Sequence, residues 1–227
     1  MRVPPQELFD KTFIRAIKDY FLFIEKNYPK KTLIKLVGDR YLLNKTQRTI
    51  LYRGIFKKKE IKRRKKMKAR KISGKDIFVD CYNVIYTIAN YLYGRPMYIG
   101  NDNFLRDAGD SLGKIPYNDI FYKSVDMVFE FLKKENPRSV TFLIDEPVSY
   151  SGELAFALNK RIGELPFRGM ALTVKSPDYR LKNIQEGVIA TSDSAIIDKA
   201  KVKVFDMARE ILKRKYKPCF IHLKRYL

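Results

Sequence analysis

The chain has 227 residues, of which 45% are hydrophobic, and this is enough for one large core or two smaller ones. Its formal net charge is +22, and it has two cysteines and a single histidine, His222. These counts argue against a disulfide-stapled fold, a thiolate zinc site, and the multi-histidine or Ser-His-Asp sites of many hydrolases. The sequence has no apolar run long enough to cross a bilayer and no signal-peptide pattern, so we expect a cytoplasmic protein that does not enter a membrane.

The positive charge is concentrated in the first third of the chain. Residues 1 to 76 contain 24 Lys and Arg against 7 Asp and Glu, whereas the remaining residues contain 23 against 18. A strongly basic segment joined to a nearly balanced one is typical of a protein whose partner is a polyanion. Nucleic acid is the first candidate for that partner.

The N-terminal region is expected to be helical. Apolar residues three and four positions apart between residues 6 and 27 predict an amphipathic helix, and a second, short helix is expected over residues 32–37. A third is expected to start at Asn44, whose side chain can form a capping box with Gln47, and to continue into the basic run that follows. The expected result is a small all-helical domain, residues 1–56.

Residues 57–71 form an almost uninterrupted positive run, in which 11 of 15 residues are basic and one is acidic. Such a run is often a solvated helix or a linker, and we assign residues 57–74 to a basic helix extension or linker. Its lack of counter-charge and its place before the first strand favour contact with RNA phosphates, with DNA less favoured and a membrane surface a distant second. The basic residues expected to hold nucleic acid are Arg40, Arg48, Arg53, Lys57, Lys58, Lys59, Lys62, Arg63, Arg64, Lys65 and Lys66.

From residue 75 onward, short apolar strands alternate with helices. Strands are expected at residues 76–80, 139–145, 170–174, 187–191 and 202–205. Helices are expected at residues 83–92, 118–134, 152–163, 193–200 and 206–213, with a loop-rich stretch at residues 94–116. This alternation predicts an α/β domain, residues 75–227, with a parallel sheet covered by helices.

Three of the apolar runs finish on an aspartate, namely Asp80, Asp145 and Asp193. Because the carboxyl ends of parallel strands share one edge, where ligands bind, these carboxylates are expected to converge, with Asn83 facing the same cleft. Several carboxylates in one crevice are stable when they share protons or bind a divalent cation, and we favour Mg²⁺ or Mn²⁺. Each residue also has a plainer interpretation as a helix cap, but capping alone does not explain an aspartate after three different strands.

A further metal ligand is expected from one of two places. The polar loop 101–114 carries Asp107 and Asp110 and has the composition of a flexible segment that covers a substrate. Asp198 lies five residues after Asp193 and is equally consistent with metal contact and with an exposed helix face.

The order of these motifs resembles that of the PIN-like nuclease superfamily, and of its NYN branch in particular. The motifs that carry the resemblance are Asp80-Cys81-Tyr82-Asn83 after the first strand and Ala190-Thr191-Ser192-Asp193 after a late one, within residues 75–215. The resemblance implies a Rossmannoid α/β fold in which Asp80, Asp145 and Asp193 hold Mg²⁺ or Mn²⁺. It further implies that Asn83 orients a ligand or phosphate and that Asp107 or Asp198 completes the site.

The N-terminal region also resembles part of a known arrangement. The stretch from Leu36 to Leu43, followed by Gln47-Arg48, is similar to the helical domain of an uncharacterised prokaryotic family in which such a domain precedes a PIN-like one.

The leading hypothesis is a metal-dependent ribonuclease whose basic N-terminal region holds the RNA. A non-catalytic RNA- or ribosome-binding protein on the same fold is an alternative, and a phosphatase or phosphotransferase with Asp80 as nucleophile is a third. Tyr82, Tyr86 and Tyr117 are candidates for base stacking, although tyrosines are more often core or surface filler. The sequence leaves open the RNA target, the endo- or exonucleolytic mode of cleavage, and the oligomeric state. A homodimer is one option for that state.

Overall fold

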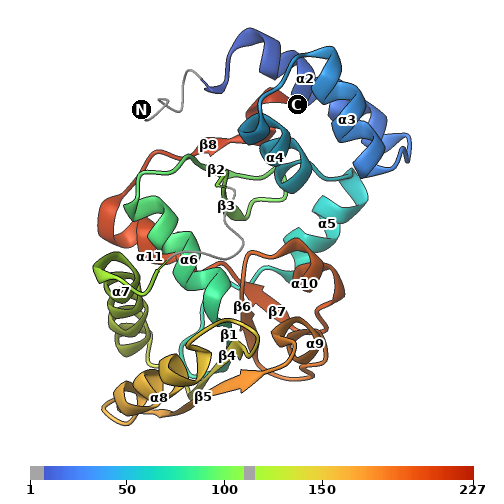
Figure 1. Ribbon diagram of the computed structural model, residues 1–227. Helices are drawn as coiled ribbons and strands as arrows, with labels where there is room; N and C mark the ends of the chain where they lie inside the picture. The colour runs from blue at the N-terminus through green and yellow to red at the C-terminus, as the bar shows by residue number, and fades with distance from the viewer. Residues whose placement is uncertain (1–7, 110–115) are drawn as a thin grey trace. The chain divides into compact units, whose positions relative to one another are not determined.

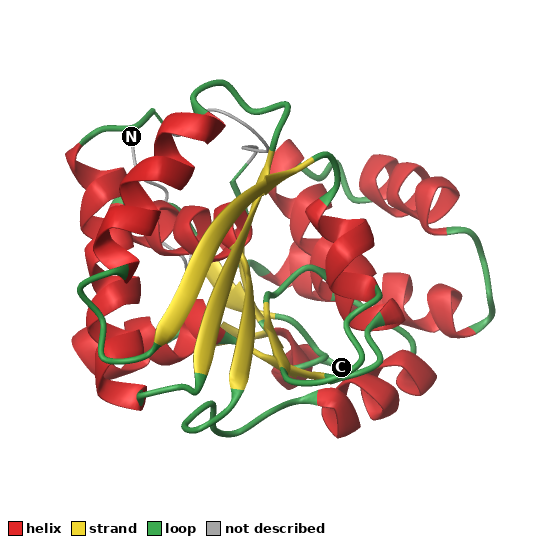
Figure 2. Cartoon of the chain, turned by 90° about the horizontal axis from the view of Figure 1, so that it is seen from below, coloured by secondary structure: helices red, strands yellow, loops and turns green. Residues whose placement is uncertain are grey.

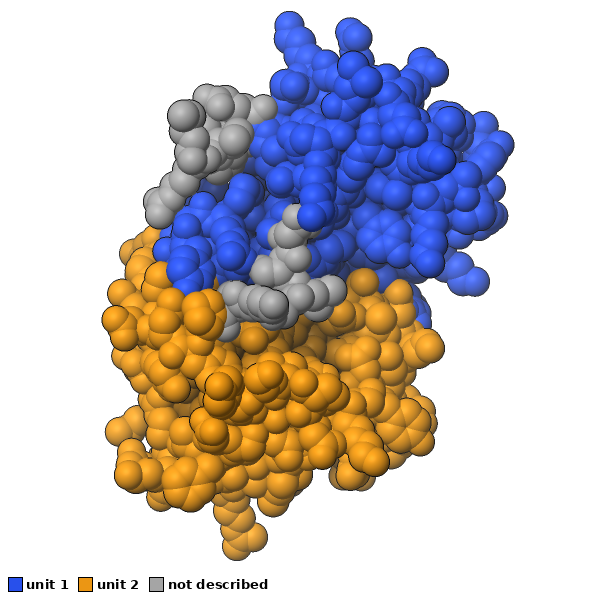
Figure 3. Space-filling view, viewed as in Figure 1, with its two compact units in different colours: residues 1–66, 90–112, 218–227 blue, residues 67–89, 113–217 orange. Residues whose placement is uncertain are grey.

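The computed structural model describes residues 8–109 and 116–227 (Figure 1). The chain divides into two compact units: unit 1 comprises residues 1–66, 90–112 and 218–227, and unit 2 comprises residues 67–89 and 113–217 (Figure 3). No helix within the described ranges is both long enough and apolar enough to span a membrane. The division differs from the expected boundary at residue 75, because two later segments of the chain join the N-terminal helices in unit 1.

Unit 1 combines helices with a small sheet. Its described elements are α2 (Lys11–Glu25), α3 (Lys30–Arg40), α4 (Lys45–Gly54), α5 (Lys58–Met67), β2 (Met97–Ile99), β3 (Leu105–Asp107), β8 (Ile221–His222) and the 3₁₀ helix η1 (Leu223–Tyr226). Strand β2 pairs antiparallel with β3 and parallel with β8. The stretch expected to be loop-rich, residues 94–116, therefore also contains β2 and β3, which were not predicted because strands of three residues give too short a pattern to recognise.

The core of unit 1 explains why the last residues of the chain belong to it. Tyr20 of α2, Tyr98 of β2 and Leu223 of η1 are all buried in one hydrophobic cluster. Gly54, at the end of α4, makes this packing possible. A Cβ atom on Gly54 would lie only 2.5 Å from Leu223 Cδ1 and 2.6 Å from Tyr98 Cε2, so a larger residue would push η1 and β2 away from α4.

The third helix was expected to continue into the basic run, but in the structure it ends before that run. Helix α4 begins with the expected Asn44–Gln47 capping box, but Ile55 has an extended backbone (φ −113°, ψ 125°) that ends it. The side chain of Asn101, in the β2–β3 turn, then bonds both the N–H and the carbonyl of Phe56, at 3.1 and 2.9 Å. In a continuous helix these backbone groups would form hydrogen bonds within the helix. Asn101 takes their place as partner and so stabilises the break before α5.

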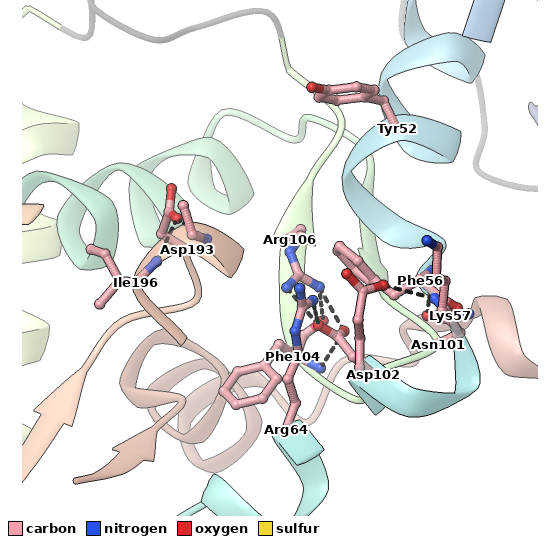
Figure 4. A network of polar contacts seen from close by, with 12 residues as sticks. Tyr52, Phe56, Lys57, Arg64, Asn101, Asp102, Phe104, Arg106, Asp193 and Ile196 are labelled. Atoms are coloured by element: carbon pink, nitrogen blue, oxygen red, sulfur yellow. Dashed lines mark hydrogen bonds and ion pairs between the residues drawn. The ribbon is translucent and has the colours of Figure 1, made fainter. Parts of the chain in front are cut away.

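Helix α5 is held in unit 1 by a buried ion cluster (Figure 4). The fully buried carboxylate of Asp102 accepts hydrogen bonds from Arg64 at 2.7 Å and from Arg106 at 2.7 and 2.8 Å. The Arg64 guanidinium also stacks over the Phe56 ring, 3.8 Å from its centroid. Burial alone would raise the pKa of Asp102, but Arg106 and Arg64 hold it below its usual value. Arg64 was expected to contact nucleic acid, and this was wrong because its side chain is only 1% exposed.

Unit 2 has the predicted α/β architecture. Its elements are β1 (Asp76–Asp80), α6 (Cys81–Leu92), α7 (Asp119–Glu135), β4 (Ser139–Asp145), α8 (Ser151–Ile162), β5 (Arg168–Val174), α9 (Pro177–Lys182), β6 (Val188–Ala190), α10 (Ser194–Lys199), β7 (Lys203–Phe205) and α11 (Met207–Tyr216). The five strands are parallel and lie in the order β5-β4-β1-β6-β7. The parallel sheet flanked by helices is confirmed, and β1 and β4 have the bounds that the sequence predicted.

Helices cover both faces of this sheet (Figure 2). Helices α7 and α8 lie on one side, where the Phe129 ring of α7 stacks on the Phe142 ring of β4 at 5.8 Å, and α9 and α10 lie on the other (Figure 1). The chain builds the sheet outward from β1 to β4 and β5, then returns to build β6 and β7 on the opposite side of β1. The strand order thus reverses between β1 and β6. In open α/β sheets, ligands bind at the carboxyl ends of the strands at this point.

The ion cluster at Asp102 generates a stability prediction. Replacing Asp102 with Asn leaves two buried guanidiniums without their counter-charge and is expected to lower the free energy of unfolding by about 3 to 5 kcal/mol. Asp39→Asn is the matched control, because Asp39 also pairs with an arginine, Arg48 at 2.9 Å, but is 60% exposed. The control should lose less than about 1 kcal/mol. Urea denaturation of the two variants measures the difference, and equal losses would contradict the prediction.

Candidate active site

Asp80 occupies the switch point of the sheet. It is the last residue of β1, and only 7% of its surface is exposed. Thr191 follows the neighbouring strand β6, and its hydroxyl donates a hydrogen bond of 2.7 Å to Oδ2 of Asp80. The ends of β1 and β6 are therefore joined through side chains as well as through the backbone ladder.

Asn83 strengthens the same junction from the first turn of α6. Its side-chain oxygen accepts a hydrogen bond of 2.9 Å from the Ser192 backbone N–H and lies 3.2 Å from the Ser192 hydroxyl. The same oxygen is 3.2 Å from the Thr191 hydroxyl. From the sequence, Asn83 could either cap a helix or face the strand ends. In the structure its side-chain oxygen is hydrogen-bonded to the segment that follows β6.

Asp193 has two roles in the structure. Its Oδ1 accepts hydrogen bonds from the backbone N–H groups of Ala195, at 2.6 Å, and Ile196, at 3.2 Å, which makes it the N-cap of α10 (Figure 4). Its own N–H donates to the Thr191 hydroxyl at 3.1 Å. The helix-cap interpretation is confirmed, but the same residue also supports the Thr191 hydroxyl that bonds Asp80.

The charges of three other aspartates act on Asp80. Burial raises the pKa of Asp80 to about 7, the hydrogen bond from Thr191 works against this rise, and the charges of Asp193, Asp178 and Asp145 add to it. The pKa of Asp145 is also raised, by burial and by the charge of Asp178. The charges of Asp145 and Asp193, the other two predicted strand-end acids, therefore reach Asp80.

Asp178 belongs to this group and was missed in the sequence. It lies in α9, is 53% exposed and pairs with Lys182 at 3.2 Å. A signal for it was present, because Ser176 caps α9 and Pro177 stands in its first turn, which together mark a helix start just after strand β5. Asp178 thus occupies the same kind of position as Asp193, beyond the carboxyl end of a strand.

The other acids proposed as metal ligands are Asp107, Asp110 and Asp198. Asp107 lies in β3 of unit 1, where its Oδ1 accepts a hydrogen bond from Gly109 N–H at 3.1 Å. Asp110 lies outside the described residues. Asp198 is half-buried in α10.

The donor types at this edge suit a hard cation. Among residues 8–109 and 116–227, no three His, Cys, Asp or Glu side chains come close enough together to surround one metal ion. Mg²⁺, however, is usually held by one or two carboxylates, with water and substrate phosphates completing its shell. Burial is the largest cause of the raised pKa values of Asp80 and Asp145, and the charges of other aspartates add to it. A cation at this edge would be held by fewer than three close side chains of these types among the described residues.

The basic residues predicted to hold RNA fall into two classes, both within unit 1. Arg48 has a structural role, since it pairs with Asp39 and donates to the backbone carbonyls of Leu43 and Ile34. Lys57 donates to the Asn27 side chain at 2.9 Å, and Arg53 is half-buried in the last turn of α4. The exposed members are Arg40 at the end of α3 and, on α5, Lys58, Lys59, Lys62, Arg63, Lys65 and Lys66.

The raised pKa of Asp80 predicts a pH dependence of stability. The folded state binds the Asp80 proton more tightly than the unfolded state, so the stabilisation is fully present below the ordinary value of 3.8 and is lost as the pH rises to about 7. Asp80→Asn mimics the protonated form. At pH 8 it should be more stable than wild type by about 2 to 4 kcal/mol, and at pH 4 the two should be nearly equal. Thermal melts of both proteins from pH 4 to 8 measure this, and curves that stay parallel would contradict it.

Comparison with known proteins places the chain in a family. A model for "Domain of unknown function (DUF5616)" matches residues 69–210, and a model for "Protein of unknown function (DUF434)" matches residues 12–67. A Methanocaldococcus jannaschii protein named "Uncharacterized protein MJ0935" is 34% identical over 207 residues, which cover 88% of this chain and 98% of the relative. No solved structure gave a significant match. The chain belongs to the DUF5616 family, with a DUF434 match in its N-terminal region.

Proposed function

We propose that this protein is a metal-dependent ribonuclease that hydrolyses RNA phosphodiester bonds at the carboxyl edge of the unit 2 sheet. One observation carries the proposal: Asp80 is buried at the switch point of the sheet, hydrogen-bonded to Thr191, with the charges of three further aspartates within reach. Burying a carboxylate among others destabilises the fold, so such an arrangement is expected where function requires it. The resemblance of the Asp80–Asn83 and Thr191–Asp193 motifs to PIN-like nucleases agrees with this interpretation.

The residues of the site have separate roles in this proposal. Thr191 and Asn83 fix the position of the Asp80 carboxylate and of the loop after β6. Asp80, with Asp193 or Asp145, would hold Mg²⁺ or Mn²⁺, which when bound would lower the pKa of a water and offset the charge of the scissile phosphate. Asp80 must lose its proton to bind a cation, so cation affinity should rise as the pH passes about 7. Without a cation, these carboxylates repel RNA phosphates.

Helix α5 is the proposed RNA-holding surface. Arg64 anchors it to Asp102, while six other basic residues remain exposed on it: Lys58, Lys59, Lys62, Arg63, Lys65 and Lys66. Because the helix is docked at its buried arginine, these charges are displayed on a fixed element and not on a free tail. Phosphate contacts of this kind give affinity that depends on salt and carry little sequence information.

A non-catalytic RNA- or ribosome-binding protein is the second candidate. The lack of a three-ligand metal group among the described residues favours it. Both proposed functions use the α5 surface, but the second needs no cation. A test for metal-dependent cleavage therefore distinguishes them.

The catalytic proposal predicts the effect of two conservative variants. Asp80→Asn and Asp193→Asn should each reduce Mn²⁺-dependent cleavage of a labelled RNA by at least about 100-fold, because each removes a negative charge while keeping the side-chain shape. Asparagine also caps helices well, so α10 should remain intact in Asp193→Asn. Asp126→Asn is the control, since Asp126 is a 56% exposed aspartate of α7 that pairs with Arg161 at 2.8 Å. Full activity in both site variants would rule out the proposal.

The α5 surface predicts a change in salt dependence. Replacing Lys62 and Lys65 with Gln removes two exposed charges and should reduce the slope of log K against log salt by about 1.4 for single-stranded RNA. The control replaces Lys133 and Lys213, which are exposed in the last turns of α7 and α11, and so changes the net charge equally. Fluorescence anisotropy with labelled RNA between 50 and about 300 mM salt measures both slopes. The same slope in the two double variants would exclude α5 as a specific RNA-holding surface.

A further inference from the structure

Four tyrosines of unit 2 form a connected aromatic group. Tyr82 and Tyr86 are one turn apart in α6, with ring centroids 5.1 Å apart. The hydroxyl of Tyr82 is 2.6 Å from that of Tyr117, which precedes α7. The Tyr117 ring in turn meets the Tyr150 ring at 6.4 Å with an interplanar angle of 65°. The group therefore runs from a buried end at Tyr82 to an exposed end at Tyr150.

Tyr150 has an unusual backbone conformation. Its φ of 64° lies in the left-handed region, which is costly for an aromatic residue, and 66% of its surface is exposed. The loop that carries it is fixed by hydrogen bonds from Val148 N–H to the Asp145 carbonyl, at 3.2 Å, and from the Ser151 hydroxyl to the Glu146 carbonyl, at 3.0 Å. A strained backbone in a fixed loop therefore displays a large ring to solvent, and packing does not explain this arrangement.

The tyrosine group adjoins the candidate active site along the chain. Tyr82 comes two residues after Asp80, and Tyr150 comes five residues after Asp145. Burial, followed by the charges of Tyr117, Cys81 and Asp145, raises the pKa of Tyr86 to about 12, so the charge of Asp145 reaches this ring.

The surrounding charge indicates which ligand suits these rings. Residues 145–159, which include Tyr150, contain Asp145, Glu146 and Glu153 and no Lys or Arg, and the charge of Glu153 also reaches Tyr117, so this segment repels a phosphate. An uncharged flat ring whose exocyclic amines donate hydrogen bonds is complementary to tyrosine faces beside carboxylates. Unpaired nucleobases have this chemistry, whereas the faces of bases in a duplex are already stacked.

We propose that Tyr150 and Tyr117 form a subsite that stacks one unpaired nucleobase of the RNA beside the candidate active site. This inference rests on the proposed ribonuclease function and adds to it a requirement for single-stranded RNA at the site.

The test uses the full chain and a ten-nucleotide single-stranded RNA that contains one 2-aminopurine, whose fluorescence falls when the base stacks. Binding is measured in the presence of Ca²⁺, a cation that takes oxygen ligands. Wild type should quench the single strand but not the same strand in a duplex. Tyr150→Ala should bind about tenfold more weakly, as expected for the loss of one base-stacking ring.

Matched variants separate stacking from folding. Phe156→Ala removes a 76% exposed ring from α8, the helix that Tyr150 precedes, and should bind like wild type. Tyr150→Gly should also bind about tenfold more weakly while melting at a higher temperature than Tyr150→Ala, because glycine relieves the positive φ. Tyr117→Phe keeps the ring and should retain binding.

Equal affinity of Tyr150→Ala and wild type, or quenching that is the same for single strand and duplex, would overturn the subsite. RNA cleavage that persists alongside either result would leave the ribonuclease proposal standing. Conversely, quenching that Tyr150→Ala weakens, in a protein that cuts no RNA with Mn²⁺, would overturn the ribonuclease and support base binding alone.

Discussion

The hydrogen bond between Asp80 and Thr191 is the contact on which the organisation of unit 2 depends. It forms where the strand order of the parallel sheet reverses, so it connects the end of β1, from which the first series of crossovers starts, with the segment after β6, from which the second starts. Asn83 and Asp193 add their own hydrogen bonds to the same short segment after β6. A polar junction this well connected keeps a carboxylate in place although burial and neighbouring charges oppose its ionisation. The proposed activity, the pH dependence and the tyrosine subsite all follow from where this carboxylate is held.

Much of unit 2 could be predicted from the sequence because its signals are local. β1 and β4 are apolar runs that end on aspartates, and helices between such runs imply a parallel sheet. Asp178 escaped notice because α9 has only six residues, too few for a recognisable apolar period. The roles of Asn83 and Thr191 were only partly predictable, since the partners of each lie more than 100 positions away in the chain.

Unit 1 was harder to predict because its stabilising contacts are between distant segments. Nothing in the run of basic residues distinguishes Arg64 from its neighbours, since its partner Asp102 lies 38 positions later. The three-stranded sheet likewise joins residues 97–107 to residues 221–222. The two family matches meet at residues 67 and 69, yet residues 90–112 lie inside the second match and pack in unit 1. Separating the chain at that junction would therefore remove part of the core of unit 1.

The burial of Leu223 against Gly54 also bears on how the protein is made. Domains usually fold as they emerge during translation, beginning at the N-terminus. Here helices α2, α3 and α4 are synthesised before unit 2, but Leu223 and the β8 strand that complete their core are synthesised after it. The apolar faces of the nascent helices therefore stay exposed to solvent until unit 2 has been synthesised. Chaperones can bind them during this period.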